Sequence, residues 1–189
     1  MQDDLITFDI EWLSLPKAEF KMLVMIADKG KNLGNASDMC RYFNRSPQSK
    51  NKNPLRKALQ SLAEQNIIEL KQNKNNYAAI IQKTILQENK IQIKRKYLTE
   101  ILQHNYTQKV AEVTVLKVYI WLLNVGESLF TNRQIVECIG VSESTVTEAK
   151  NALKEMGAVL INKITIKEGE QFYKCIGQKV EPSAFWNNV

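Results

Sequence analysis

The sequence has few of the residues on which enzyme and metal sites commonly depend. A single histidine, His104, and three widely spaced cysteines occur among its 189 residues. Zinc sites combine closely spaced cysteine or histidine pairs, so this set predicts no metal ion and no bound cofactor. Glycine-rich phosphate loops and carboxylate pairs at a fixed spacing are also missing from the sequence. We therefore expect a protein that binds a partner without catalysing a reaction.

Long apolar runs and a secretory leader are missing as well. No stretch approaches the roughly eighteen apolar residues of a membrane-spanning helix. The first ten residues, MQDDLITFDI, lack the basic start of a signal peptide. An odd number of distant cysteines (Cys40, Cys138 and Cys175) is typical of reduced thiols. These features predict a cytoplasmic protein with no membrane partner.

Positive charge is concentrated in one short window. Residues 41–60 contain six Lys or Arg and no acid, which equals the net charge of +6 of the whole chain. A basic run alone is usually a solvated surface, whereas a basic run on a suitable fold indicates nucleic acid as the partner.

The spacing of apolar residues indicates one order of elements, three helices and a hairpin, in the first half of the chain. Apolar residues at helical spacing predict a helix over 17–28 and a second helix that begins at an N-cap residue, Asn35. A third helix is expected to start at Asn53, because proline, here Pro54, is well tolerated at the first helical position. Two short apolar runs, 67–70 and 77–81, then predict a hairpin.

The same order recurs in the second half. A helix from about Val110 to Gly126 precedes a second helix that Thr131 and Gln134 begin with capping-box spacing. Ser142 is expected to cap a third helix, and the runs 159–166 and 172–176 predict another hairpin. The predicted class is therefore mainly α with small β-hairpins (α+β), in two units, 1–89 and 90–189, the second with a C-terminal tail.

Residue matches support this internal repeat. Asn35, Met39 and Phe43 align with Thr131, Ile135 and Ile139 at a constant offset of 96, and Ala58-Leu59 aligns with Ala152-Leu153 at 94. A fainter match at an offset of 85 aligns Ile6 and Phe8 with Ile91 and Ile93. Each unit is thus expected to begin with a short strand.

Three helices followed by a hairpin, with a tight turn before the third helix, resemble the winged helix-turn-helix. The most specific stretch is TNRQIVECIGVSESTVTEAKNALKEMGAV (131–159), whereas residues 35–68 depart from the pattern by a longer, basic turn and a proline. Two such units on one chain are similar to the tandem winged-helix initiators of plasmid and phage replication. The resemblance implies duplex DNA as the partner, with the third helix of each unit in the major groove.

The first unit carries most of the predicted DNA-binding residues. Cations near the start of the third helix lie at the positive end of its dipole, where they lower the stability of the helix. An anion such as DNA phosphate is therefore expected to bind them. Among these residues Arg56 is expected to contact a guanine, and the lysines of the hairpin are expected to touch the DNA backbone or a minor groove. The predicted contacts of this unit are Arg41, Arg45, Gln48, Lys50, Asn51, Lys52, Asn53, Arg56, Lys57, Lys71 and Lys74.

The second unit is less basic. Its third helix carries three glutamates against Lys150 and Lys154, and its neutral side chains suit bases or phosphate. The predicted contacts there are Ser144, Thr145, Thr147, Lys150 and Asn151. A structural copy that packs against the first unit or a partner is the alternative. The segment KIQIKRKY (90–97) either follows the DNA backbone or connects the units.

The predicted function is site-specific binding of double-stranded DNA, as a transcription regulator or as the replication initiator of a mobile element. Replication or transcription proteins are further expected partners, and no oligomeric state is predicted. The alternative is a protein-interaction module, of the primosome or chromosome-organising type, in which the winged helices hold a protein partner.

Overall fold

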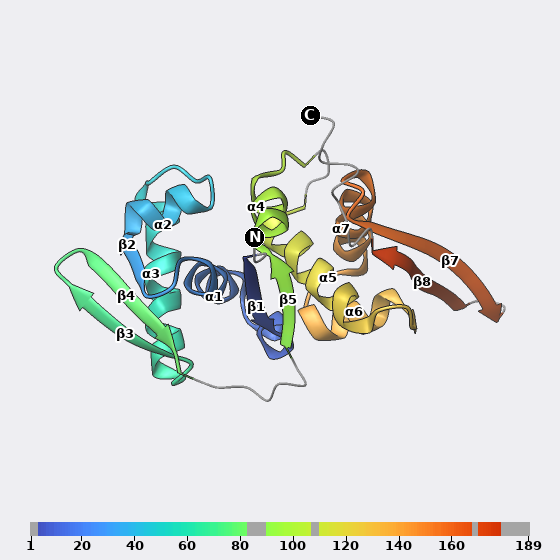
Figure 1. Cartoon of the computed structure of the whole chain (residues 1–189), viewed down its shortest axis with the longest axis horizontal. Coiled ribbons are helices and arrows are strands. Elements are labelled where there is room, and N and C mark those ends of the chain that lie inside the picture. Colours follow the sequence, from blue (N-terminus) through green and yellow to red (C-terminus); the bar gives the residue numbers. More distant parts are fainter. Residues whose placement is uncertain (1–3, 83–89, 107–109, 168–169, 179–189) are drawn as a thin grey trace. The chain divides into compact units, whose positions relative to one another are not determined.

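The computed structural model describes residues 4–82, 90–106, 110–167 and 170–178 (Figure 1). The chain divides into two compact units, residues 1–103 and 104–189. Both units combine helices with small antiparallel sheets, which confirms the predicted mainly helical α+β class. The predicted C-terminal tail falls on residues 179–189, which lie outside the described residues.

The first unit contains the first predicted copy, together with one strand before it and one strand and one helix after it. In chain order its elements are β1 (Leu5–Asp9), a short 3-10 helix (Ile10–Ser14), α1 (Lys17–Lys29), β2 (Asn32–Asn35), α2 (Ala36–Tyr42), α3 (Ser49–Glu64), β3 (Ile68–Asn73), β4 (Asn76–Ile81), β5 (Lys90–Lys94) and α4 (Arg95–Gln103). The helix α1 is buried on most of its surface and packs against α3. The buried carboxylate of Glu19 accepts a hydrogen bond from the Ser61 hydroxyl at 2.7 Å, which joins these two helices.

The second unit repeats the central part of this order. Its elements are α5 (Glu112–Val125), β6 (Leu129–Phe130), α6 (Asn132–Ile139), α7 (Glu143–Glu155), β7 (Val159–Lys167) and β8 (Glu170–Gln178). The helices α5, α6 and α7 pack against one another, and the hairpin follows directly on α7. None of the described helices is long and apolar enough to span a membrane.

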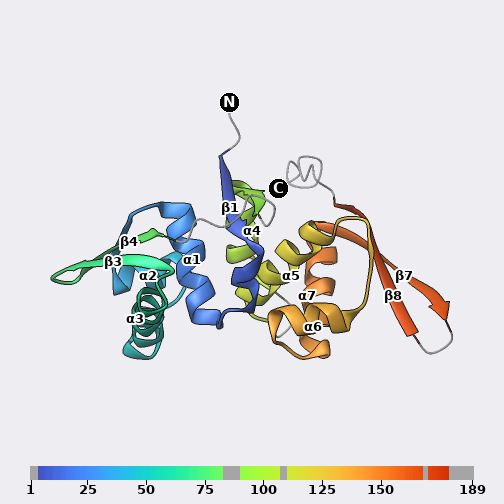
Figure 2. The ribbon, with the colours of Figure 1, turned by 90° about the horizontal axis from the view of Figure 1, so that it is seen from below.

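Each unit has a three-stranded sheet built on its hairpin. The strand orders are β2-β4-β3 and β6-β8-β7, so a short strand before the second helix pairs with the last strand of the hairpin. The pair Gly34–Tyr77 corresponds to Phe130–Tyr173 at the same offset of 96 (130 − 34 and 173 − 77). Both hairpins were predicted, but the short strands β2 and β6 were not. In each unit the hairpin projects away from the helices in both views (Figures 1 and 2).

Three of the predicted helix starts are confirmed by their N-cap residues. Asn35 and Thr131 both form capping boxes, with Asp38 and Gln134 as their partners. The Ser142 hydroxyl accepts from the Thr145 N–H at the start of α7. A side-chain oxygen at these positions satisfies an N–H group that the helix leaves without an internal partner.

The predicted start of the third helix in the first unit is wrong. The helix α3 begins at Ser49, with Gln48 as its N-cap residue, and Pro54 lies inside it rather than at its first position. Gln48 makes no side-chain capping bond, so the sequence carries no cap signal at the true start. Proline removes one hydrogen bond from a helix and its ring crowds the carbonyl oxygen four residues earlier, so it is best tolerated in the first turn. Pro54 stands beyond that turn, with the five helical residues 49–53 before it. Residues 50–53 are therefore helical rather than part of the preceding turn.

The strand β5 places the boundary between the units later than expected. Residues 90–94 pair with β1 inside the first unit, with Ile6 opposite Ile93 and Phe8 opposite Ile91. The observed division after Gln103 thus differs from the predicted one at 89/90, because β5 and α4 belong to the first unit. The sequence repeat aligns Ile6 with Ile91 and Phe8 with Ile93. The strand β1 therefore pairs with β5, the strand to which it corresponds in the repeat.

Ion pairs of Arg95, the first residue of α4, further attach this helix to the first unit. Its guanidinium pairs with the carboxylates of Asp4 and Asp28 and donates to the Asp28 carbonyl oxygen at 2.7 Å. The Asp28 side chain is only 7% exposed, so Arg95 supplies the charge that this buried carboxylate needs. Burial, together with the negative charge of Asp28, raises the pKa of the neighbouring Tyr42 hydroxyl above its ordinary value. Segment 90–97 is thus an integral part of the first unit.

Candidate nucleic-acid interface

The turn between α2 and α3 is held by a side chain that was predicted to contact DNA. Asn44 has a positive φ of 51°, and the chain then runs through exposed residues to the N-cap, Gln48. The amide Nδ2 of Asn51 donates to the Ser46 carbonyl oxygen at 2.8 Å and contacts the Ser46 hydroxyl at 3.3 Å. Asn51 therefore fixes the turn against the helix, and its donor group is used within the protein.

The phase of α3 determines which of its side chains face outward. Leu55, Ala58, Leu59 and Leu62 are its buried face. At 100° per residue, the opposite face carries an exposed row formed by Lys50, Asn53, Lys57 and Gln60. Three of these four residues were predicted contacts. Gln60 was missed, although its position three residues after Lys57 was visible in the helical period.

Arg56 and Lys52 lie on the flank of α3 that faces α2. Burial raises the pKa of the Cys40 thiol on α2, and the positive charges of Lys52 and Arg56 oppose that rise. Lys52 is half-buried and Arg56 is exposed. The expectation that Arg56 stands at the head of the helix came from the wrong helix start, and Lys57 occupies the centre of the outward row instead.

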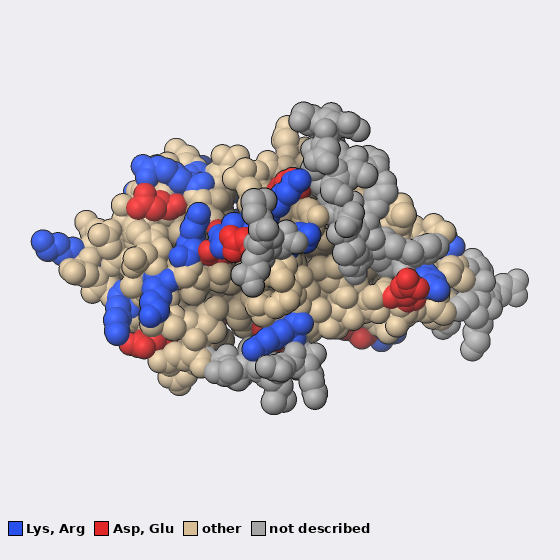
Figure 3. All heavy atoms as spheres, in the orientation of Figure 1, with Lys and Arg blue, Asp and Glu red and all other residues tan. Residues whose placement is uncertain are grey.

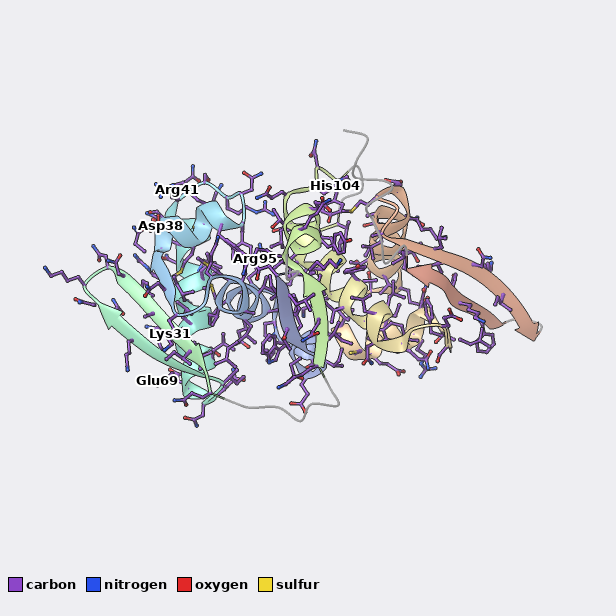
Figure 4. All side chains as sticks on the ribbon, in the orientation of Figure 1. Lys31, Asp38, Arg41, Glu69, Arg95 and His104 are labelled. Atoms are coloured by element: carbon purple, nitrogen blue, oxygen red, sulfur yellow. The ribbon has the colours of Figure 1, made fainter. Side chains whose placement is uncertain are left out.

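Some of the predicted cations have acidic partners. Arg41 pairs with Asp38 at 2.7 Å on α2, and Lys71 pairs with Glu69 at 2.9 Å on β3. The hydrogen bond and charge of Lys71 hold the pKa of the Glu69 carboxyl below its usual range. Figure 4 shows Arg41 beside Asp38 on α2, and Glu69 on the hairpin. These two pairs lower the positive charge that α2 and the hairpin offer to an anion.

Five other predicted cations have no acidic partner among the described residues. Figure 3 shows Lys and Arg side chains (blue) over α2 and along the β3–β4 hairpin, with acidic side chains (red) beside some of them. Within the part of the chain that the structure describes, no acidic side chain forms an ion pair with Lys50, Lys52, Arg56, Lys57 or Lys74. Lys74 lies in the turn of the hairpin, at a positive φ of 53°. Arg45 and Gln48 are exposed in the turn before α3.

In the second unit, α7 presents a row of short polar side chains. Val146, Ala149, Ala152 and Leu153 are buried. Ser144, Thr147 and Asn151, all predicted contacts, are exposed on the opposite face. The Ser144 hydroxyl lies 2.9 Å from that of Ser142, and the Thr147 hydroxyl accepts from Asn132 Nδ2 at 3.2 Å. Thr145 is half-buried, and its hydroxyl lies 2.8 Å from that of Ser142, so it belongs to the cap of the helix. Lys154 continues the exposed row and was not predicted.

The prediction that Lys150 contacts DNA conflicts with its burial. Its side chain is 4% exposed, and its ammonium nitrogen lies 3.2 Å from the centroid of the Tyr173 ring and 5.8 Å from that of Phe130. The ammonium donates to Asn132 Oδ1 at 2.6 Å. Burial, with a smaller effect of Lys154, lowers the pKa of Lys150 to about 8. Lys150 is thus a packing residue between α7, α6 and the sheet.

The described residues form no cluster of side chains that could hold a metal ion. Among residues 4–82, 90–106, 110–167 and 170–178, no group of three or more His, Cys, Asp or Glu side chains is placed to hold a metal ion. His104 is exposed, and its ring lies 4.8 Å from that of Tyr106. No protein-family model, curated protein or solved structure matches this chain. The side chains and their arrangement alone therefore carry the functional interpretation.

Proposed function

We propose that this protein binds duplex DNA site-specifically and does so as two tandem winged helix-turn-helix units. The observation that carries the proposal is the outward row of α3, where Lys50 and Lys57 are exposed without acidic partners among the described residues. Lysines on one face of a helix that follows a short turn can meet phosphates on both sides of a groove. The amide of Asn53 lies between the two lysines, and that of Gln60 lies beyond Lys57. Both amides can form hydrogen bonds with base edges.

The hairpin and the flank of α3 add to the same surface. Arg56 and Lys52 extend the positive charge of α3 toward α2, and Lys74 places a charge at the turn of the hairpin. Arg41 and Lys71 can reach phosphate only in competition with Asp38 and Glu69. Such exposed pairs are weak, so both cations remain secondary candidates for phosphate contacts.

Duplex binding by the whole chain tests this proposal. We expect fluorescence anisotropy with a random 30-base-pair duplex to show binding at 50 mM salt that weakens by orders of magnitude at 200 mM. Selection from a random duplex pool should then yield one preferred sequence. No measurable duplex binding at 50 mM salt would contradict the proposal and favour the protein-interaction alternative.

Two biological roles fit such a protein, regulation of transcription and initiation of replication. A genome-wide map of bound sites distinguishes them, because promoter positions support the regulator and iterated repeats at an origin support the initiator. The DNA-binding surface is the same in both roles.

A further inference from the structure

The third helices of the two units are equivalent in phase as well as in order. The N-cap residues Gln48 and Ser142 differ by 94 positions (142 − 48), and so do the first helical residues, Ser49 and Glu143. The buried positions agree at this offset: Leu55 with Ala149, Ala58 with Ala152, Leu59 with Leu153 and Leu62 with Met156. The outward rows can therefore be compared residue by residue.

The two outward rows have different chemistry. In α3 the row is Lys50, Asn53, Lys57 and Gln60, and the equivalent positions in α7 are Ser144, Thr147, Asn151 and Lys154. All eight side chains are exposed. At the two positions where the first unit has lysines, the second unit has a serine and an asparagine. The first row thus carries charge at both of these positions, and the second carries short neutral groups.

The surroundings of the α7 row increase this difference. Glu143, Glu148 and Glu155 lie on the same helix, and one of its two lysines, Lys150, is buried and directed toward Tyr173. The charges that α7 leaves at its surface are therefore three carboxylates and the ammonium of Lys154. Carboxylates repel phosphate, so this helix gains little from the charge of the DNA backbone.

The α7 row still suits one kind of partner. Hydroxyl and amide groups donate and accept hydrogen bonds with base edges. The hydroxyls of Ser144 and Thr147 each make one bond within the protein, to Ser142 and Asn132, and a hydroxyl has further donor or acceptor sites for a base. Short side chains also permit the close approach of the helix to the floor of the major groove. A row of Ser, Thr and Asn lacks the Trp, Tyr and Arg residues in which the energetic centres of protein–protein interfaces are enriched.

We infer, on the basis of the DNA-binding function proposed above, that the two units divide the recognition of one DNA site. The first unit supplies the salt-dependent contacts to phosphate through Lys50 and Lys57. The second unit reads base edges through Ser144, Thr147 and Asn151 and contributes sequence preference without salt dependence.

Paired variants of the full chain test this division. The double change K50A/K57A removes the charge of the first row, and S144A/T147A/N151A removes the polar groups of the second. A charge-matched control, K17A/K29A, removes two exposed lysines that both lie on α1. Each protein is titrated with the duplex selected by the unchanged protein and with a scrambled duplex, at 50, 100 and 200 mM salt.

We expect K50A/K57A to weaken binding to both duplexes by similar factors and to reduce the slope of log affinity against log salt by about two. The triple variant should keep the slope and lower the ratio of selected to scrambled affinity at least about tenfold, since three contacts to base edges are lost. The control should change neither quantity by a comparable amount.

The opposite results overturn the inference. They are a slope that falls in the triple variant, or an affinity ratio that falls in K50A/K57A. Circular dichroism establishes that each variant is folded. If the triple variant is unfolded, Asn151→Ala replaces it, because the Asn151 side chain makes no hydrogen bond within the described residues. An unchanged protein that binds no duplex would instead refute the underlying DNA-binding proposal.

Discussion

At the scale of single residues, Lys150 shows how tertiary packing changes the role that a sequence suggests. Its exposed neighbours on α7, Thr147 and Asn151, made a DNA contact a reasonable expectation. Phe130 and Tyr173, which come from strands 43 residues apart (173 − 130), enclose its ammonium. In the first unit the position of Phe130 is held by Gly34, and the equivalent of Lys150, Arg56, is exposed.

The burial of Lys150 predicts a pH dependence of stability. Its pKa in the folded protein is lowered to about 8 from the ordinary 10.5, so the unfolded chain binds more protons between these values. The contribution of Lys150 to the free energy of unfolding is therefore smallest below pH 8 and increases as the pH rises toward 10.5. Between pH 7 and pH 9.5 we expect the free energy of unfolding to gain up to about 2 kcal/mol from Lys150.

Urea unfolding of the wild type and of Lys150→Met at both pH values isolates this contribution. Other groups titrate equally in the two proteins, so their effects cancel in the difference. The wild type should gain stability relative to the variant as the pH rises. A difference that stays constant between pH 7 and pH 9.5 would mean that Lys150 keeps an ordinary pKa.

At the scale of elements, Pro54 is the feature of α3 that most directly affects its stability. It occupies the sixth helical position, where it offers no N–H group to the carbonyl oxygen of Lys50. We expect Pro54→Ala to complete this hydrogen bond and to stabilise the protein by about 1 to 3 kcal/mol. Thermal unfolding measured by circular dichroism gives the change.

Pro47→Ala is the matched control, because Pro47 is exposed in the turn just before α3. There the proline restricts the unfolded chain at no cost to a helix, so its replacement should lower stability by up to about 1 kcal/mol. If both substitutions have the same sign and size, Pro54 does not disturb the helix.

The element-level predictions succeeded where a local signal exists. Asn35, Thr131 and Ser142 mark helix starts because their side chains bond to N–H groups two or three residues later. The start of α3 has no such signal, since Gln48 makes no capping bond. The strands β2 and β6 are too short for an alternating pattern, and their pairing with β4 and β8 depends on contacts distant in the sequence.

The candidate site was predictable to a similar degree. Composition located the basic window, and helical periodicity is sufficient to place Lys50, Asn53 and Lys57 on one face once the helix start is known. The roles of Asn51 and Lys150 depend on contacts with the turn and the sheet, and no periodicity encodes them.

At the scale of the whole molecule, the pairing of β1 with β5 decides which part of the chain forms a complete first unit. A fragment that ends at residue 89 lacks the partner strand of β1 and also lacks Arg95. The buried carboxylate of Asp28 then loses its contact with Arg95 and keeps Lys29, at 3.9 Å, as an ion-pair partner. Because the Arg95 side chain is 36% exposed, we expect the loss to cost less than the roughly 3 to 5 kcal/mol typical of a fully buried pair. Fragment 1–103 should therefore be more stable than fragment 1–89.

Trp12 provides the measurement, since it is the single tryptophan in both fragments and is buried beside Phe8, with 6.3 Å between the ring centroids. We expect its fluorescence to report a cooperative urea transition for 1–103 and a transition at lower urea, or none, for 1–89. Arg95→Met in fragment 1–103 separates the ion pair from the strand pairing, because it retains β5. It should fall between the two fragments in stability. Equal urea midpoints for 1–89 and 1–103 would show that the first unit is complete without β5 and α4, and the boundary would return to residue 89.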